Sequence, residues 1–195
     1  MTQENTCTSL PFKIPLREYR AFRDALIRIV MKENQKITTY PNSKNIKTET
    51  YQDGDIFVTR HFYNGKNAFV KELIFLQNGI TKVKHNTEKG VASKLEHFVD
   101  GMRQGIETRY FVAKADGSVK STKTYDQGKL HGANIIYNEL GEIVKHEVFA
   151  TGKLVLKYLR EDSESNEITK VEVLDEANVE NLPADELEKL QALRS

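Results

Sequence analysis

The chain has 195 residues, 38% of them hydrophobic, and 29 basic against 28 acidic side chains give a formal net charge of +1. This size and apolar content permit one domain with a buried core and appended helices, and they exclude a disordered tail. The near-neutral total gives no general reason to expect nucleic acid as a partner. The charge is unevenly placed, because residues 41–160 hold 19 basic against 13 acidic side chains and residues 161–195 hold three against 11.

The N-terminus and the cysteine content bear on the compartment. Cys7 is the only cysteine, so no intramolecular disulfide can form. The opening text MTQENTCTSLPFKIP lacks the basic segment and following apolar run of an export signal. The most apolar windows, DALIRIVM and FVKELIFL, are far shorter than the roughly 20 residues that cross a bilayer. We therefore expect a soluble protein of the cytoplasm.

Residues 1–46 are expected to form an N-terminal arm with an amphipathic helix. From Leu16 to Met31 the apolar side chains recur at steps of three and four, the spacing of one helical stripe. Such a stripe favours a helix that packs on the rest of the domain. The alternative is a helix that binds an anionic membrane surface or a partner groove through its basic face. The basic side chains of that face are Arg17, Arg20 and Arg28.

Residues 47–175 contain a repeat. The pattern G-x7-[FY]-x2-G occurs four times, and its aromatic positions are Phe62, Phe98, Tyr125 and Phe149. The space between the two glycines fits one strand at about 3.3 Å per residue, and glycine suits a tight turn because positive φ costs it little. The repeat therefore predicts a mainly β fold, an antiparallel meander of consecutive hairpins with about ten or eleven strands. The four aromatic side chains are expected to form a row across neighbouring units.

One unit of the repeat resembles a known family. The text YDQGKLHG, with Tyr125, Gly128, Lys129, His131 and Gly132, resembles the core of the MORN repeat. The longer text through NELGEIVKHEVF is similar to the bacterial, antitoxin-type MORN variant, and the resemblance extends over roughly residues 50–160. It implies a sheet of stacked hairpins that binds partners, without an active site. His131 is expected to form a hydrogen bond within its own turn.

Residues 176–195 are expected to form an acidic linker and a short C-terminal helix. The text LPADELEKLQALRS places Pro183 near the first helical turn. Asp185 and Glu186 follow at the N-terminal end and Arg194 lies at the C-terminal end, an order that suits the helix dipole.

The sequence contains no recognisable catalytic motif. The five histidines show no H-x3-H, HExxH or Cys/His spacing, so we expect no metal and no cofactor. His61 and His97 share a position in their repeats and would meet only if those units stacked closely. Cys7 has no defined base nearby, and the glycines are turn glycines rather than a phosphate-binding loop. The sequence therefore predicts a protein that is not an enzyme.

Binding through the sheet is the function that we expect. Alternation along strands places every second side chain on an uncovered face. The candidate partner contacts are Arg103, Arg109, Lys120, Lys123, Lys129 and His131. The family resemblance implies an antitoxin or immunity protein that neutralises a toxin by direct binding, and the alternative is a scaffold that binds anionic lipid through Arg17, Arg20, Arg28 and the basic sheet. An open edge strand would also allow a homodimer.

Overall fold

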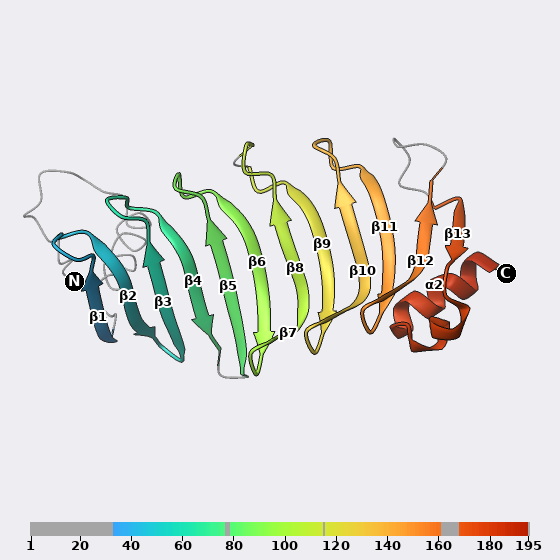
Figure 1. Ribbon diagram of the computed structural model, residues 1–195, viewed down its shortest axis with the longest axis horizontal. Helices are drawn as coiled ribbons and strands as arrows, with labels where there is room; N and C mark the ends of the chain where they lie inside the picture. Colours follow the sequence, from blue (N-terminus) through green and yellow to red (C-terminus); the bar gives the residue numbers. More distant parts are fainter. Residues whose placement is uncertain (1–32, 77–78, 115, 161–167, 195) are drawn as a thin grey trace, which may run out of the picture. The chain divides into compact units, whose positions relative to one another are not determined.

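The computed structural model describes residues 33–76, 79–114, 116–160 and 168–194. These residues form one 13-stranded sheet in which strands that are neighbours in the sequence are neighbours in space (Figure 1). The strands are β1 (Glu33–Thr39), β2 (Ile46–Asp53), β3 (Ile56–Phe62), β4 (Phe69–Phe75), β5 (Ile80–Asn86), β6 (Ala92–Val99), β7 (Met102–Arg103), β8 (Gly105–Tyr110), β9 (Val119–Asp126), β10 (Lys129–Tyr137), β11 (Ile143–Ala150), β12 (Lys153–Leu159) and β13 (Lys170–Val173). The two-residue β7 pairs only with β6.

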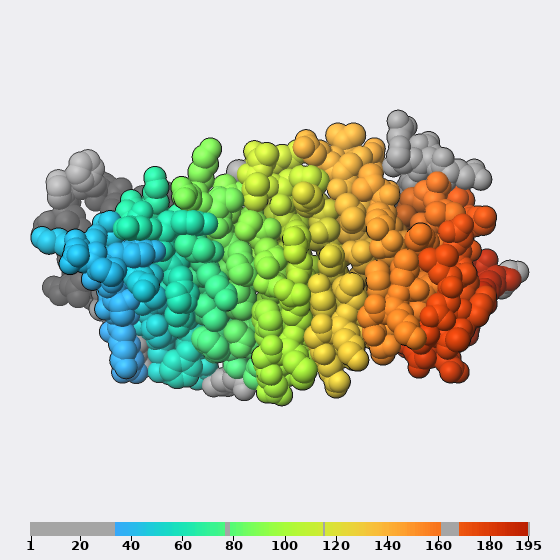
Figure 2. All heavy atoms as spheres, viewed as in Figure 1, coloured from blue at the N-terminus to red at the C-terminus, as the bar shows by residue number. Residues whose placement is uncertain are grey.

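The predicted meander of consecutive hairpins is confirmed, although the sheet has 13 strands and not the expected ten or eleven. In the space-filling view the strands follow one another as bands in sequence order (Figure 2). The sheet begins before residue 47, because β1 lies within the stretch that we assigned to the arm. The predicted helix at residues 16–31, with Arg17, Arg20 and Arg28, lies outside the described residues.

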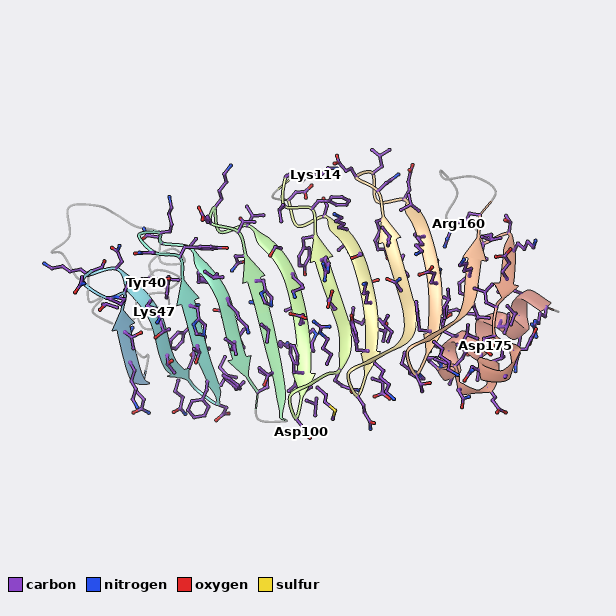
Figure 3. All side chains as sticks on the ribbon, in the orientation of Figure 1. Tyr40, Lys47, Asp100, Lys114, Arg160 and Asp175 are labelled. Carbon is purple, nitrogen blue, oxygen red and sulfur yellow. The ribbon has the colours of Figure 1, made fainter. Side chains whose placement is uncertain are left out.

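The hairpins close with different turns at the two ends of the sheet. Asp100 and Lys114 mark these ends (Figure 3). The turns at the Asp100 end include three two-residue turns in which both residues have positive φ, the type I′ geometry that matches the strand twist. They are Asp100–Gly101 (50° and 78°), Gln127–Gly128 (46° and 82°) and Thr151–Gly152 (49° and 93°). At the Lys114 end, Gly90 and Gly141 close three-residue turns by donating to Thr87 O and Asn138 O.

Two turns at the Asp100 end donate hydrogen bonds to the hairpin that precedes each of them. Thr151 N donates to His131 Nδ1 at 3.3 Å, and Gln127 N donates to the Gln104 side chain at 2.9 Å in the preceding hairpin. Backbone bonds run beside them, from Gly128 N to Arg103 O (2.9 Å) and from Gly152 N to Leu130 O (2.7 Å). His131 therefore contacts the next turn along the chain. The prediction of a hydrogen bond within its own turn is wrong. This contact links one repeat to the next.

The predicted aromatic row is only partly correct. Phe98, Tyr125 and Phe149 lie on β6, β9 and β11, which run in the same direction and end at the Asp100 end. Phe62 lies at the opposite end, because two strands separate β3 from β6 and the direction of the repeat is therefore reversed. Its ring packs edge-on against Phe69 with centroids 6.4 Å apart.

The main apolar core lies at the C-terminal end of the sheet. Val148, Leu156 and Tyr158 of β11 and β12 pack with Leu182 and Leu190, and all five are at most 6% exposed. Burying each such aliphatic side chain contributes about 1.5–3 kcal/mol. The chain here forms a 3₁₀ helix, η1 (Glu176–Asn181), and the helix α2 (Ala184–Arg194), so the predicted C-terminal helix is confirmed. No helix within the described part has the length and apolar content to cross a membrane.

Candidate functional site

The strand register divides the side chains of the sheet between two faces. His146, Val148 and Tyr158 lie on the face that packs against α2, which we call the helix face. The opposite face, which we call the basic face, carries two rows of register partners across β8, β9, β10 and β11. One row is Arg109, Ser121, Ile136 and Lys145, and the other is Glu107, Lys123, Asn134 and Glu147.

A depression of about 360 Å³ opens on the basic face over these rows. We call it the basic depression, and its lining residues are Arg109, Lys120, Ser121, Lys123, Asn134, Ile136 and Lys145. Its shape follows from side-chain size, because the small Ser121 lies in the middle of a row that has long cations at both ends. Three strand spacings of about 4.8 Å separate Arg109 from Lys145, so the opening is roughly 14 Å wide at the backbone.

Two cations of the basic depression are held by buried carboxylates. Arg109 Nε donates to Glu107 Oε1 at 2.8 Å, and Lys145 Nζ lies 2.8 Å from Glu147 Oε1. Glu107 is 3% exposed and Glu147 is 6% exposed, whereas the two cationic side chains are about half exposed. The hydrogen bond that Arg109 donates to Glu107 raises the pKa of Arg109. These carboxylates thus fix the directions of Arg109 and Lys145 at the edges of the depression.

The other two cations have no carboxylate partner within the described part of the chain. Lys120 lies at a bulge, because the β8–β9 register shifts between Arg109 and Tyr110, and its Nζ is 6.0 Å from the centre of the Phe111 ring. Lys123 is half-buried beside Glu107 and Asn134 in its row. Four cations therefore line a site that contains two carboxylates, so the local excess is two positive charges.

Buried polar groups lie on both sides of Lys123 in its row. Asn134 Nδ2 donates to Glu147 Oε2 at 3.1 Å, which orients the amide. Its Oδ1 and Glu107 Oε2 are buried and accept no hydrogen bond from any residue that the structure describes. Arg103 Nε lies 4.0 Å from that Glu107 oxygen. The unpaired acceptors are therefore buried beside Lys123, while the cationic donors line the depression.

The structure groups the predicted contact residues into two sets. Arg109, Lys120 and Lys123 come together around the basic depression. Arg103 is occupied instead, because it pairs with Glu96 at 3.1 Å and stacks 5.3 Å over the ring of Tyr125. Lys129 and His131 lie outside the depression, near the β9–β10 turn.

Sequence reasoning missed Lys145 and all the buried carboxylates of the sheet. The buried glutamates on the strands are Glu49, Glu72, Glu96, Glu107 and Glu147. All five have a Lys or Arg within two positions on the same strand or opposite in the register, and only this pairing pattern could have indicated them. Burial alone would raise the pKa of Glu96, but hydrogen bonds from Lys94 and His85 outweigh it and lower that pKa.

The histidines of the first repeats do not form a pair. His61 pairs with Lys71 in the β3–β4 register, whereas His97 pairs with Lys82 in the β5–β6 register, and these two registers place the rings on opposite faces. Burial and the charge of Lys94 lower the pKa of His85. Among the described residues, no three His, Cys, Asp or Glu side chains are grouped as metal ligands.

Comparison with known proteins gives little beyond this geometry. No family model matches the chain, and no curated protein matches it. Two crystal structures are similar over part of their length. One is of a mutant S. aureus TarM in complex with fondaparinux, alpha-GlcNAc-glycerol and UDP, with a TM-score of 0.36, 14% identity, and coverage of 74% of this chain and 24% of that one. The other is of TarM, with a TM-score of 0.34, 14% identity, and coverage of 70% and 22%. The chain thus spans about a quarter of the length of these TarM chains.

Proposed function

We propose that this chain is a non-enzymatic protein-binding module of the cytoplasm, and that its basic depression receives an acidic segment of a partner protein. The partner that we propose is a toxin, which the chain neutralises by direct contact, as an antitoxin-type MORN-like protein would. The observation that supports this proposal is the excess of two positive charges around the basic depression, on a wide and regular sheet face. Complementary charge of this kind selects partners and accelerates association.

The depression is suited to recognition because its parts are already positioned. Arg109 and Lys145 are held by buried carboxylates, so little side-chain freedom is lost when a ligand binds. Lys120 and Lys123 have no competing carboxylate among the described residues, and they are free to pair with a partner.

Co-expression tests the proposal directly. The tagged chain is produced together with the products of the reading frames beside its own gene, and complexes are isolated by affinity and gel filtration. We expect one product to form a complex, and growth arrest by that product alone to be relieved by the chain. The double variant Lys120→Glu/Lys123→Glu should lose both effects. The matched control is Lys47→Glu/Lys66→Glu, which makes the same charge change at exposed sites far along the sheet.

Two results would contradict the proposal. Equal loss of the complex in both double variants would show that overall charge, and not the basic depression, controls binding. Salt-sensitive flotation of the chain with phosphatidylglycerol vesicles, without a protein complex, would favour the lipid-binding scaffold instead.

A further inference from the structure

We infer that the basic depression is a site for a doubly charged phosphoryl group, carried on a phosphorylated serine or threonine side chain of the partner. This inference rests on the proposed function and specifies the chemistry that the depression recognises. It depends on three features of the site: the charge balance, the directions of the donors and the volume of the depression.

The charge balance matches a dianion. Arg109 and Lys145 are neutralised by Glu107 and Glu147, which leaves Lys120 and Lys123 without a counter-charge in the described residues. A phosphoserine side chain carries about −1.5 to −2 charges at pH 7. A single carboxylate would leave one positive charge without a partner.

The donors approach from three strands. Arg109 comes from β8, Lys120 and Lys123 from β9, and Lys145 from β11. Arg109 uses Nε for Glu107, so the terminal amino groups of its planar fork remain for an oxyanion. A tetrahedral phosphoryl group has three acceptor oxygens that point in different directions, whereas a carboxylate has two in one plane. The arrangement of donors therefore fits a phosphoryl group better.

The volume of the depression is sufficient for a phosphoryl group on a peptide. About 360 Å³ has room for one phosphoryl group and part of the peptide that carries it. The buried acceptors Asn134 Oδ1 and Glu107 Oε2 belong to the two register neighbours of Lys123, so its ammonium group can turn between them and a ligand. Lysine has three donors, so Lys123 can serve both.

The test uses short, blocked and otherwise uncharged peptides with a fluorescent label, identical except for a central phosphoserine, glutamate or serine. Their binding to the full chain is measured by anisotropy at constant ionic strength. We expect the phosphoserine peptide to bind at least about tenfold more tightly than the glutamate peptide, since charge-assisted bidentate contacts to phosphate are the stronger ones. Inorganic phosphate should compete with it. Lys120→Gln/Lys123→Gln should weaken the phosphoserine peptide about tenfold or more, whereas Lys47→Gln/Lys66→Gln should leave it unchanged.

The outcomes separate this inference from the proposed function. Equal affinity for the phosphoserine and glutamate peptides would overturn the phosphoryl site, while a protein complex in co-expression would still support the binding module. Tight binding of the phosphoserine peptide without any protein complex would contradict the proposed protein-binding function. The basic depression would then be a site for anions only. Flotation with phosphatidic acid vesicles, without binding of the phosphoserine peptide, would show that the phosphoryl group comes from a lipid and would overturn the inference that a partner protein carries it. Each variant is checked for an unchanged thermal midpoint, so loss of folding is not mistaken for loss of the site.

Discussion

The hydroxyl group of Tyr158 donates a hydrogen bond of 2.9 Å to Glu186 Oε2, and this bond joins strand β12 to helix α2. Tyr158 is 3% exposed and Glu186 is 1% exposed. The second carboxylate oxygen of Glu186 accepts from Lys189 Nζ at 2.7 Å. Burial, together with the hydrogen bond to Glu186, raises the pKa of Tyr158, so the phenol stays protonated and donates. The attachment of α2 therefore includes a charged hydrogen bond inside the apolar core.

Removal of this hydrogen bond should destabilise the protein. Tyr158→Phe leaves a buried carboxylate oxygen without its donor, and we expect a loss of about 1–3 kcal/mol in the free energy of unfolding. Urea unfolding followed by circular dichroism measures the loss. The control is Tyr137→Phe, because the Tyr137 hydroxyl has no hydrogen bond within the described residues, and its effect should be within about 0.5 kcal/mol. Equal effects of the two variants would show that the bond contributes nothing.

His146 should make the stability depend on pH. It is 8% exposed beside Tyr158, with ring centroids 4.5 Å apart, and its Nε2 has no partner in the part of the chain described. Burial lowers its pKa from 6.5 to about 4; the nearby Glu186 opposes this shift, and Arg160 and Lys189 add to it. The folded state therefore keeps His146 neutral while the unfolded chain gains a proton below pH 6.5.

The contribution of His146 to the free energy of unfolding should consequently be present above pH 6.5 and be lost as the pH drops from 6.5 toward 4. Between pH 7 and pH 5 we expect a loss of about 1–2 kcal/mol from this group. Urea midpoints at pH 7, 6 and 5 measure it. His146→Phe keeps a ring at this position but cannot titrate, so its decrease should be smaller than that of the parent by the same amount. Parallel pH profiles of parent and variant would disprove the assignment. The contribution of His85 cancels in this comparison because both proteins contain it.

Gly132 should tolerate a side chain less well than another glycine of similar backbone. Gly132 has φ of 101°, and a Cβ there would lie 3.3 Å from Thr124 Cβ and 3.5 Å from Pro183 Cγ. Gly141 has φ of 87° with nothing within 4 Å of such a Cβ. We expect Gly141→Ala to cost about 1 kcal/mol from φ alone and Gly132→Ala about 2–3 kcal/mol. Thermal unfolding of the two variants gives the comparison, and equal shifts would remove the role of crowding.

Glu96 should be more important than its residue type suggests. It is 3% exposed and accepts from Lys94 at 2.8 Å, His85 at 2.9 Å and Arg103 at 3.1 Å. Glu96→Gln keeps the size but removes the charge that the three donors share, and we expect a loss of about 1–3 kcal/mol. The exposed Glu88→Gln is the control, with an effect within about 0.5 kcal/mol. A loss that disappeared in high salt would indicate an exposed pair rather than a buried one.

The sequence predicted the fold well because its turns carry local signals. Glycines at fixed spacing specify where strands end, and Gly101, Gly128 and Gly152 indeed lie at one end of the sheet with positive φ. The same signal failed for Phe62, because strand direction depends on how many strands intervene and not on the repeat itself. The C-terminal helix was also predicted correctly because its signals are local. The position of Pro183 and the order of the charges are visible in the amino-acid sequence.

The site was only partly predictable because it is built across strands. Arg109, Lys120 and Lys123 lie close together in the sequence, so a search for basic strand residues found them. Lys145 joins them only through the register that pairs it with Ile136, which sequence spacing does not reveal. Glu107 resembles an ordinary surface glutamate in the text, but cross-strand neighbours bury it. Burial of a charge depends on its neighbours in space, and these become known only with the structure.

The hydrogen bonds that tie the Gln127–Gly128 and Thr151–Gly152 turns to the preceding hairpin have a consequence for evolution and engineering. Gln104 and His131 lie 27 positions apart, and the side chain of each accepts a hydrogen bond from a backbone N–H of the following turn. A tandem duplication of residues 105–131 would supply both the donor and the acceptor at its new junctions, so the meander could gain two strands without changing any existing register. Chains of this kind can therefore vary in length as whole modules, and the number of modules sets how far their working surface extends.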